Sequence, residues 1–203
     1  MKNDMHPDDV KTISHYQSLL NQHGENYRSL DWGSRESQKK RFEILAGIGV
    51  GPGDRVLDVG CGFADFNGWL IEHRPGIEYS GIDFTPGMVE KAQARFPNLK
   101  ILNKTIFDLD LAIAPFDYLF ASGIFVFRQE NPVDYLFSTV KTMYGFCTKG
   151  IAFNCLSLWA KEKSPNEFYA DPTNVINFCK TLTRKVVLRH DYHPADFTIY
   201  LYR

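Results

Sequence analysis

The sequence predicts an α/β protein in which a doubly wound sheet of seven strands, six parallel and the last antiparallel, has helices on both faces. Two observations carry this prediction. Short apolar, β-favouring runs alternate with helix-like segments from residue 55 onward, and strands separated by helices run parallel through right-handed crossovers. Only a short stretch around residues 193–195 separates the final two strands, so the last strand must turn back antiparallel.

Two helical segments are predicted before the sheet begins. They cover residues 8–21 and 34–46, where apolar side chains recur near helical spacing. We expect the whole chain, residues 1–203, to form a single domain. In that domain, residues 1–46 cover a ligand site and residues 55–203 form the core.

The strands and helices of the core follow from the alternating pattern. The predicted strands cover residues 55–59, 78–82, 99–103, 118–121, 151–154, 186–191 and 197–202. The predicted helices cover residues 63–74, 86–96, 132–146 and 172–182. Three helices start with a capping residue and a proline, namely Thr85-Pro86, Asn131-Pro132 and Asp171-Pro172. Proline is tolerated there because its missing N–H would have no partner in the first turn.

Composition and charge are those of an ordinary globular domain. Of 203 residues, 44% are hydrophobic, and 23 Lys and Arg against 24 Asp and Glu give a formal net charge of −1. This balance disfavours a nucleic-acid partner, because it offers no field that would attract a phosphate backbone. No apolar run approaches the about twenty residues of a membrane span, and the N-terminus lacks the apolar core of a signal peptide. The four cysteines show no Cys-x-x-Cys spacing, so we expect a cytoplasmic protein with free thiols and no membrane partner.

The most informative motif is Val-Leu-Asp-Val-Gly-Cys-Gly at residues 56–62. It is typical of a buried strand that enters a glycine turn and then a helix, which presents backbone N–H groups to a ligand. A dinucleotide-binding turn would carry a third glycine three residues after Gly62, where this chain has Asp65. Because an acid there would repel a pyrophosphate, the dinucleotide alternative is weakened. Asp58, two residues before Gly60, suits a ligand that carries an ammonium group.

This motif resembles the first motif of the class I S-adenosylmethionine-dependent methyltransferases. The resemblance extends over residues 55–203, because a reversed last strand is also typical of that family. It implies a Rossmann-like methyltransferase fold and an enzyme that transfers a methyl group from S-adenosylmethionine, leaving S-adenosylhomocysteine. The resemblance assigns Asp58, Gly60, Cys61 and Gly62 to the cofactor.

The following strand ends supply further predicted cofactor contacts. Gly-Ile-Asp at residues 81–83 resembles the family pattern in which the acid accepts hydrogen bonds from the ribose hydroxyls. Asp83 is therefore assigned to the ribose, and Phe84 is expected to pack on the adenine. After the third strand, either Thr105 or Asp108 is placed to accept from the adenine amino group, and both alignments stay open. The remaining predicted cofactor residues are Ile106, Ala121, Ser122, Gly123, Trp32 and Arg41.

Segments upstream of the glycine turn cover the cofactor in many relatives of this family. Here that region contains Trp32 and Arg41, and Arg41 or Tyr27 is predicted to reach the methionine carboxylate. Ordinary helix packing is the alternative role of each side chain.

Two departures from related families narrow the chemistry. The fourth strand ends in Ala-Ser-Gly-Ile-Phe at residues 121–125, where enzymes that methylate adenine in DNA or RNA carry Asn/Asp-Pro-Pro-Tyr/Phe. This difference argues against methylation of adenine amino groups by that arrangement. The sequence also lacks the acid cluster of metal-dependent catechol-type enzymes, so no metal is expected.

The substrate side is predicted from the loops after the fourth and fifth strands. The residues assigned to it are Phe125, Arg128, Asn154, Trp159 and Tyr169. Arg128 would bind a carboxylate or phosphate, and the aromatic residues form an apolar pocket or a cage for a cationic amine, with sealing of the core edge as their alternative. No residue is assigned a catalytic role, because a general base is needed only for a protonated nucleophile.

The predicted function is in-line methyl transfer to a small molecule. The alternatives are a methyltransferase acting on RNA or protein and a non-catalytic module that binds S-adenosylmethionine. The near-neutral charge and the lack of large insertions favour the small-molecule acceptor. The sequence predicts no oligomeric state.

Overall fold

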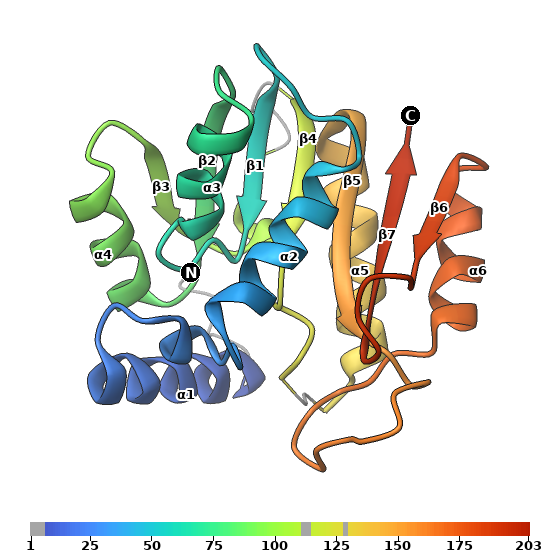
Figure 1. Ribbon diagram of the computed structural model, residues 1–203, viewed down its shortest axis with the longest axis horizontal. Coiled ribbons are helices and arrows are strands. Elements are labelled where there is room, and N and C mark those ends of the chain that lie inside the picture. Colours follow the sequence, from blue (N-terminus) through green and yellow to red (C-terminus); the bar gives the residue numbers. More distant parts are fainter. Residues whose placement is uncertain (1–6, 111–114, 128–129) are drawn as a thin grey trace.

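A seven-stranded sheet forms the centre of the molecule (Figure 1). The computed structural model describes residues 7–110, 115–127 and 130–203. In order across the sheet the strands are β3 (Lys100–Asn103), β2 (Glu78–Asp83), β1 (Arg55–Val59), β4 (Phe116–Ala121), β5 (Cys147–Leu156), β7 (Asp196–Tyr202) and β6 (Val186–Arg189). Strand β7 pairs antiparallel with both β5 and β6, and the other pairs are parallel. The predicted fold class, with six parallel strands and a reversed last strand, is confirmed.

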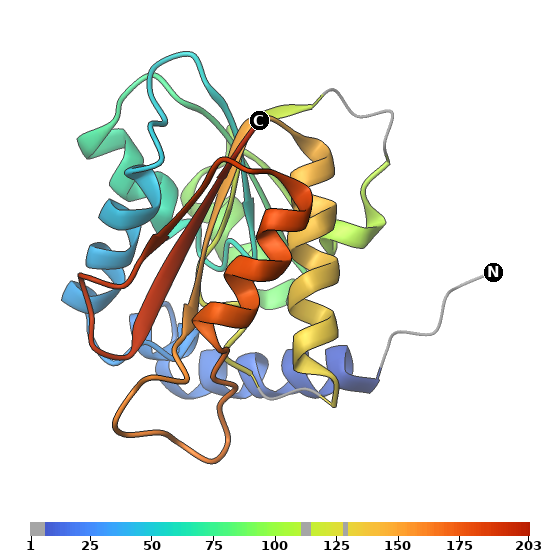
Figure 2. The ribbon, with the colours of Figure 1, turned by 90° about the vertical axis from the view of Figure 1, so that its right-hand side faces the viewer.

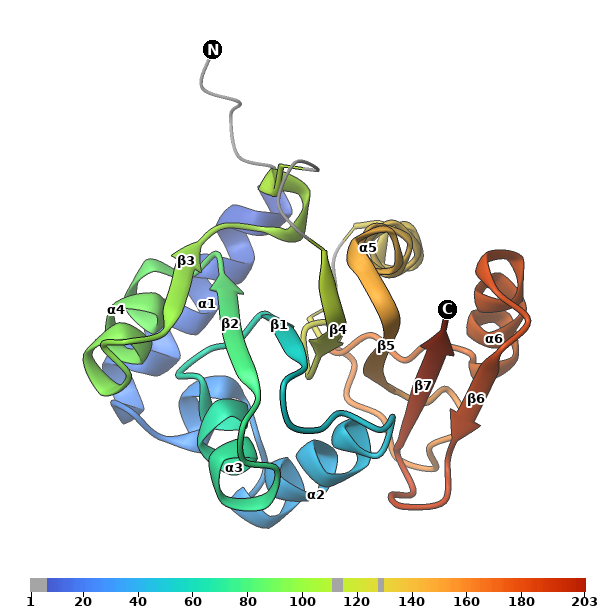
Figure 3. The same cartoon turned by 90° about the horizontal axis from the view of Figure 1, so that it is seen from above.

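Helices cover both faces of the sheet (Figure 3). They are α2 (Arg35–Ala46), α3 (Asp65–His73) and α4 (Pro86–Arg95) on one face, and α5 (Pro132–Phe146) and α6 (Pro172–Leu182) on the other. Alternation along the strands separates the two cores. Val56 and Phe120 pack with α2 and α3, whereas Leu57 and Leu119 pack with α5 and α6.

The N-terminal part of the chain lies at the carboxyl ends of the strands. Helix α1 (Pro7–His23) crosses below the carboxyl end of β1, and the short helix η1 (Tyr27–Leu30) leads from it to α2 (Figures 1 and 2). Leu20 of α1 forms a small buried cluster with Phe63 and Met88, and Tyr16 and Leu30 pack against it. This cluster attaches α1 to the turn that follows β1, through Phe63, and to α4, through Met88.

Strand lengths and helix caps differ from the sequence predictions in detail. Strand β5 begins directly after α5 and is longer than predicted, since its first residues also pair along β4. Strand β6 ends at Arg189, whose guanidinium instead bonds the carboxylate of Asp191 in the turn, at 2.7 and 2.9 Å. Of the three predicted caps only Asp171 accepts a helical N–H, from Thr173 at 2.9 Å. The side chains of Thr85 and Asn131 make no such bond, so that part of the prediction is wrong.

Within the described ranges, none of the helices combines the length and the apolar character required to cross a lipid bilayer.

Candidate functional site

The turn between β1 and α3 contains three alternating residues in the left-handed region. Gly60 has a φ of 73°, Gly62 of 53° and Ala64 of 56°. The backbone N–H groups of Gly60 and Cys61 both donate to the carbonyl of Ile82, at 2.8 and 3.0 Å. The turn is therefore fixed against the carboxyl end of β2 before α3 begins.

Asp83 connects this turn to the start of α4. Its Oδ2 accepts from the N–H of Gly62 at 2.9 Å, and its Oδ1 accepts from the N–H of Thr85 at 2.8 Å. The carboxyl group is buried, which raises its pKa, while these bonds act in the opposite direction. The Thr85 side chain also bonds the carboxylate, and because the two carboxylate oxygens together offer about four lone pairs, the group retains some accepting capacity.

Asp58 lies beneath the turn with Tyr79 as its partner. The Tyr79 hydroxyl donates to Oδ2 of Asp58 at 2.6 Å. Burial raises the pKa of Asp58 to about 7, and the bond from Tyr79 opposes this shift. A cation arriving beside this group would stabilise its ionised form.

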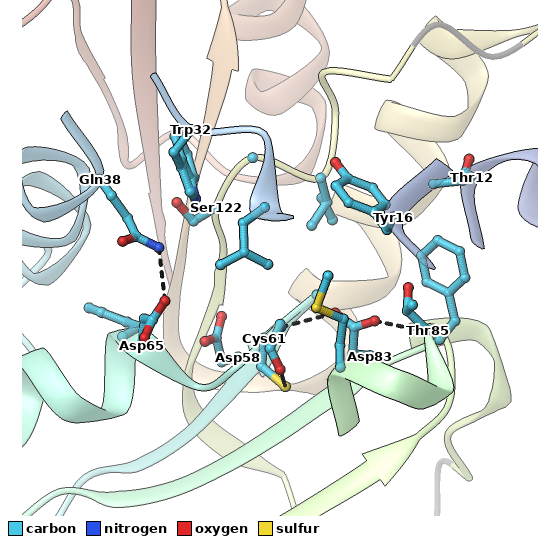
Figure 4. Close-up of a pocket in the computed structure, with 18 of the residues that line it drawn as sticks. Thr12, Tyr16, Trp32, Gln38, Asp58, Cys61, Asp65, Asp83, Thr85 and Ser122 are labelled. Carbon is cyan, nitrogen blue, oxygen red and sulfur yellow. Dashed lines mark hydrogen bonds between the residues drawn. The ribbon is translucent and has the colours of Figure 1, made fainter. Parts of the chain in front are cut away.

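A cavity opens over the turn (Figure 4). Asp58, Cys61 and Asp83 line one side of it, and Tyr16 and Trp32 from the N-terminal region line another. A second cavity continues beyond Asp83 toward β3. The residues that line both cavities are Gly60, Asp83, Phe84, Ile124 and Tyr135.

Two apolar side chains lie directly on the glycine turn. A Cβ at Gly62 would stand 2.7 Å from Cδ2 of Leu30, and a Cβ at Gly60 would stand 2.2 Å from Cγ2 of Ile124. Both contacts need glycine. They also mean that a ligand seated on the turn would contact or displace Leu30 and Ile124.

The carboxyl end of β4 forms the far wall of the first cavity. Oδ1 of Asn154 accepts from the N–H of Gly123 at 2.9 Å, and its Nδ2 donates to Oγ of Ser122 at 3.2 Å. The indole of Trp32 covers Gly123, where a Cβ would stand 2.9 Å from its Cζ2. Asn154 thus holds the loop that Trp32 covers. Ala121 lies in neither lining, because its side chain packs into the core with the α5 face.

Thr105, Ile106 and Asp108 all line the second cavity. Oδ2 of Asp108 accepts from both the N–H and the hydroxyl of Thr105, at 2.9 and 2.7 Å, and so caps the short helix η2 (Ile106–Asp108). The two residues predicted as alternative acceptors for the adenine amino group are therefore hydrogen-bonded to one another, and both remain candidates for that contact.

The structure corrects the predicted role of Arg41. It was predicted to reach the cofactor, but it lines neither cavity. Its guanidinium forms a buried ion pair with Asp196 at the start of β7 and a 2.9 Å bond to the carbonyl of Ser37. Gln38, one helical turn earlier on α2, faces the cavity instead.

The predicted substrate residues are not brought together. Phe125 is buried and packs edge-on against Tyr135 and Phe153 at ring distances of 6.0 and 5.9 Å, so its placement at the substrate surface is wrong. Trp159 is 56% exposed and stacks on His190. The Tyr169 hydroxyl bonds Glu167 in the connection between β5 and α6 (Figure 2).

Asn154 hydrogen-bonds the wall of the first cavity at Ser122 and Gly123, whereas Phe125 only packs behind that wall, against Tyr135. Arg128 lies outside the described residues.

Several cavity residues were missed by the sequence predictions. They are Thr12, Tyr16, Asp65 and Tyr135. Tyr16 was counted among the apolar residues at helical spacing in the first helix, and Asp65 was considered only as the residue that replaces a glycine. The position of Asp65 shortly after β1 was the signal available, since ligands in doubly wound sheets bind at the carboxyl ends of the strands. Tyr16 lies on α1, and only the folded structure brings it to that edge.

Comparisons with known proteins agree with this geometry. A family model described as a methyltransferase domain matches residues 56–144. Rv1506c of Mycobacterium tuberculosis, a methyltransferase by name, is 31% identical over 155 residues, which span 71% of this chain and 90% of that protein. A trans-aconitate 2-methyltransferase from Methylobacterium nodulans is 28% identical over 89 residues, or 44% of this chain and 34% of that enzyme.

The fold is also that of a solved methyltransferase. The structure of magnesium protoporphyrin IX methyltransferase from Synechocystis PCC 6803 with bound S-adenosylmethionine superposes with a TM-score of 0.73 at 11% identity, covering 100% of both chains. The sequence motif, the strand order of the sheet and the similar proteins all indicate the same family. The chain belongs to the class I S-adenosylmethionine-dependent methyltransferases.

Proposed function

We propose that this enzyme transfers the methyl group of S-adenosylmethionine to a small molecule by in-line displacement. The observation that carries the proposal is the cover over the carboxyl end of β4. We place the transferred methyl group there and call this place the methyl site. Trp32 lies on Gly123 at the carboxyl end of β4, and α1 lines the same cavity through Thr12 and Tyr16. An acceptor must fit within this covered cleft, which disfavours a folded macromolecule.

The two cavities fit the parts of the cofactor. We assign the ribose to Asp83, where the cavities meet and where the carboxylate keeps accepting capacity beyond its bonds to Gly62 and Thr85. The adenine then lies in the second cavity, and the methionine end lies in the first. The proposed contacts are Asp58, Gly60, Cys61, Gly62, Phe84, Thr105, Ile106, Asp108, Ser122, Gly123 and Trp32.

The fit rests on chemistry as well as on shape. Glycine at positions 60 and 62 leaves only the movable side chains of Ile124 and Leu30 over the turn. Asp58 offers a carboxylate on the side of the methionine end, where the ligand carries an ammonium group. These features support binding of this cofactor over a pyrophosphate, which would meet Asp58 and Asp65.

Bound S-adenosylmethionine supplies an electrophilic methyl group on a sulfonium centre. The task of the chain is to hold that group and the acceptor in line, which accounts for a large part of the rate of such reactions. Asn154 fixes Ser122 and Gly123, and Trp32 covers them. These residues are proposed to position the acceptor; no general base is assigned.

Related enzymes support the small-molecule assignment. The named substrates of two of them, trans-aconitate and magnesium protoporphyrin IX, are both small molecules. They differ widely in charge and shape, so the relatives favour the class of acceptor and not its identity.

The proposal is tested by incubating the enzyme with S-adenosylmethionine labelled in the methyl group and a cell extract divided by ultrafiltration. We expect label to enter the small-molecule fraction and S-adenosylhomocysteine to accumulate. The Asp83→Asn variant serves as the control that should lose both signals. Label found only in protein or RNA would contradict the small-molecule acceptor.

A further inference from the structure

Helix α1 brings one polar atom into the first cavity that no described residue uses, the hydroxyl oxygen of Tyr16. Tyr16 lines the cavity, and its ring is held by apolar and aromatic contacts. The ring lies edge-on to that of His15, with 5.2 Å between the centroids, and packs against the buried cluster of Leu20, Phe63 and Met88. Among the described residues none hydrogen-bonds the hydroxyl. The ring is therefore fixed, while the hydroxyl keeps its full bonding capacity.

The hydroxyl is directed to the wall where we place the transferred methyl group. Figure 4 shows the hydroxyl end of Tyr16 turned toward Trp32 and Ser122, which line the same cavity. A phenolic hydroxyl both donates and accepts hydrogen bonds. Because an unpaired hydroxyl in a cavity lacks the bonds that water would offer, a ligand group that supplies a partner at this point is favoured.

The Tyr16 hydroxyl is neutral and lies in a negative field. Burial raises the pKa of Tyr16 far above its ordinary value, and the charges of Asp31 and Asp83 raise it further. The hydroxyl therefore does not ionise near neutral pH and is not a general base. The same charges disfavour an anion beside it, and among the described residues that line this cavity there is no Lys, Arg or His to compensate.

We propose that Tyr16 positions the acceptor, and that the acceptor is an uncharged amine or hydroxyl whose N–H or O–H donates to the Tyr16 oxygen. The inference rests on the proposed methyl transfer to a small molecule and specifies the acceptor atom. A lone pair on that atom forms the new bond to the methyl carbon, and the electron pair of the broken carbon–sulfur bond stays on sulfur. The positive charge moves to the acceptor atom, whose proton then leaves to water.

A hydrogen bond to Tyr16 gains strength during this transfer. Positive charge develops on the acceptor atom, so its N–H or O–H becomes a stronger donor. An interaction that is stronger in the transition state than before it accelerates the reaction, and the bond also keeps the acceptor in line with the methyl group. A carboxylate acceptor has no hydrogen to donate and would meet the charges of Asp31 and Asp83.

Tyr16→Phe removes the hydroxyl and keeps the ring in its apolar cluster. The assay uses S-adenosylmethionine labelled in the methyl group and the small-molecule fraction of a cell extract as the source of acceptor. We expect the rate of label transfer to fall at least about tenfold, by the same factor at each pH from about 6 to 9. The affinity for S-adenosylhomocysteine, measured by calorimetry, should stay within about twofold.

Two results of these measurements overturn the proposal. A loss of S-adenosylhomocysteine affinity as large as the loss of rate would mean that Tyr16 contacts the cofactor. A loss of rate that changes with pH would mean that the Tyr16 hydroxyl exchanges a proton with the acceptor.

Tyr144→Phe is the matched control. It removes a hydroxyl that donates to the carbonyl of Tyr202 at 3.2 Å, near the end of α5 that lies away from the cavity. Its rate should stay within about threefold of the wild type. An equal loss of rate in Tyr16→Phe and Tyr144→Phe would assign the effect to general disturbance and overturn the proposal.

Mass spectrometry of the labelled product tests the acceptor class. We expect the methyl group on nitrogen or on a hydroxyl oxygen, where it resists mild alkali. Label released by mild alkali as methanol identifies a methyl ester, and label on carbon leaves no donor for Tyr16, so either result overturns the proposal. These results leave the proposed function intact. If the wild type transfers no label to small molecules, the proposed function itself fails, and the assignment of Tyr16 falls with it.

Discussion

Arg41 on α2 and Asp196 at the first residue of β7 form an ion pair whose side chains are only 9% and 2% exposed. The Arg41 guanidinium also lies over the ring of Trp32, 4.8 Å from its centroid. Trp32 in turn covers Gly123 at the end of β4. The ion pair therefore joins the last strand of the sheet to the wall of the proposed methyl site.

Breaking this pair from one side should destabilise the protein strongly. Arg41→Met removes the guanidinium from the buried Asp196 carboxylate and leaves it with the imidazole of His193, 3.4 Å away. We expect a loss of about 3 kcal/mol in the free energy of unfolding. Urea denaturation measures it. Lys40→Met on the same helix removes only the exposed pair with Glu43 and should change stability by less than about 1 kcal/mol. Similar small changes in both variants would show that the pair contributes little.

The observed position of Arg41 also shows what the sequence does and does not predict. Asp83 was assigned to the ribose because it ends a Gly-Ile-Asp pattern that resembles the family's, and as the last residue of β2 it lies beside Gly62 in the neighbouring turn. Arg41 was assigned to the cofactor because it lies in the segments that cover the cofactor in many relatives. Its partner, Asp196, lies near the other end of the chain, and only the completed sheet brings them together.

The prediction for Phe125 was also wrong because contacts with distant segments decide where this side chain lies. The residue follows β4, and in a parallel sheet such residues border the ligand site. The chain instead turns inward, so Phe125 packs on Phe153 in the core. Fold class and strand order depend on periodicity and are predictable, whereas the direction of one side chain after a strand depends on packing between distant segments.

Asp58 should make stability depend on pH. Burial raises its pKa in the folded protein to about 7, from an ordinary value of 3.8. Between these values the folded state holds a proton that the unfolded state has lost, so the ligand-free protein becomes less stable as pH rises from about 4 to 7. The shift in the Asp58 pKa limits this loss in the free energy of unfolding to at most about 4 kcal/mol.

Comparing the wild type with Asp58→Asn isolates this contribution. Urea denaturation at pH 5 and pH 8 should show a smaller loss of stability on raising the pH in Asp58→Asn, because all other titrating groups are common to both proteins. Tyr79 can still donate to the amide oxygen in the variant. An identical pH dependence in the two proteins would show that Asp58 ionises normally.

Asn154 should matter for turnover more than for cofactor binding. Asn154→Leu removes the acceptor for the Gly123 N–H and the donor to Ser122, so the loop at the proposed methyl site loses its fixed position. We expect kcat to fall at least about tenfold, with a smaller change in the affinity for S-adenosylhomocysteine. Single-turnover kinetics and calorimetry give the two quantities.

A neighbouring position provides the control for Asn154. Thr198 pairs with Asn154 across β5 and β7, is fully buried, and bonds the hydroxyl of Tyr192 at 2.8 Å. Thr198→Val therefore removes a buried polar group from the same region without touching the β4 loop. Its kcat should stay within about threefold of the wild type. Equal losses in both variants would assign the Asn154 effect to general disturbance of the strands.

Ala64 should tolerate glycine unusually well for a buried alanine. It is fully buried and adopts φ 56° and ψ 37° at the start of α3, a conformation that costs an L-residue about 1–2 kcal/mol. Ala64→Gly relieves this strain, which offsets the greater freedom of glycine in the unfolded chain. Ala92, equally buried but inside α4, gains no such relief, and Ala92→Gly should cost about 1 kcal/mol or more in the free energy of unfolding.

Thermal and urea denaturation compare the two variants, and Ala64→Gly should be more stable than Ala92→Gly by at least about 1 kcal/mol. Equal destabilisation at the two positions would mean that the turn holding the glycine motif stores no backbone strain at Ala64.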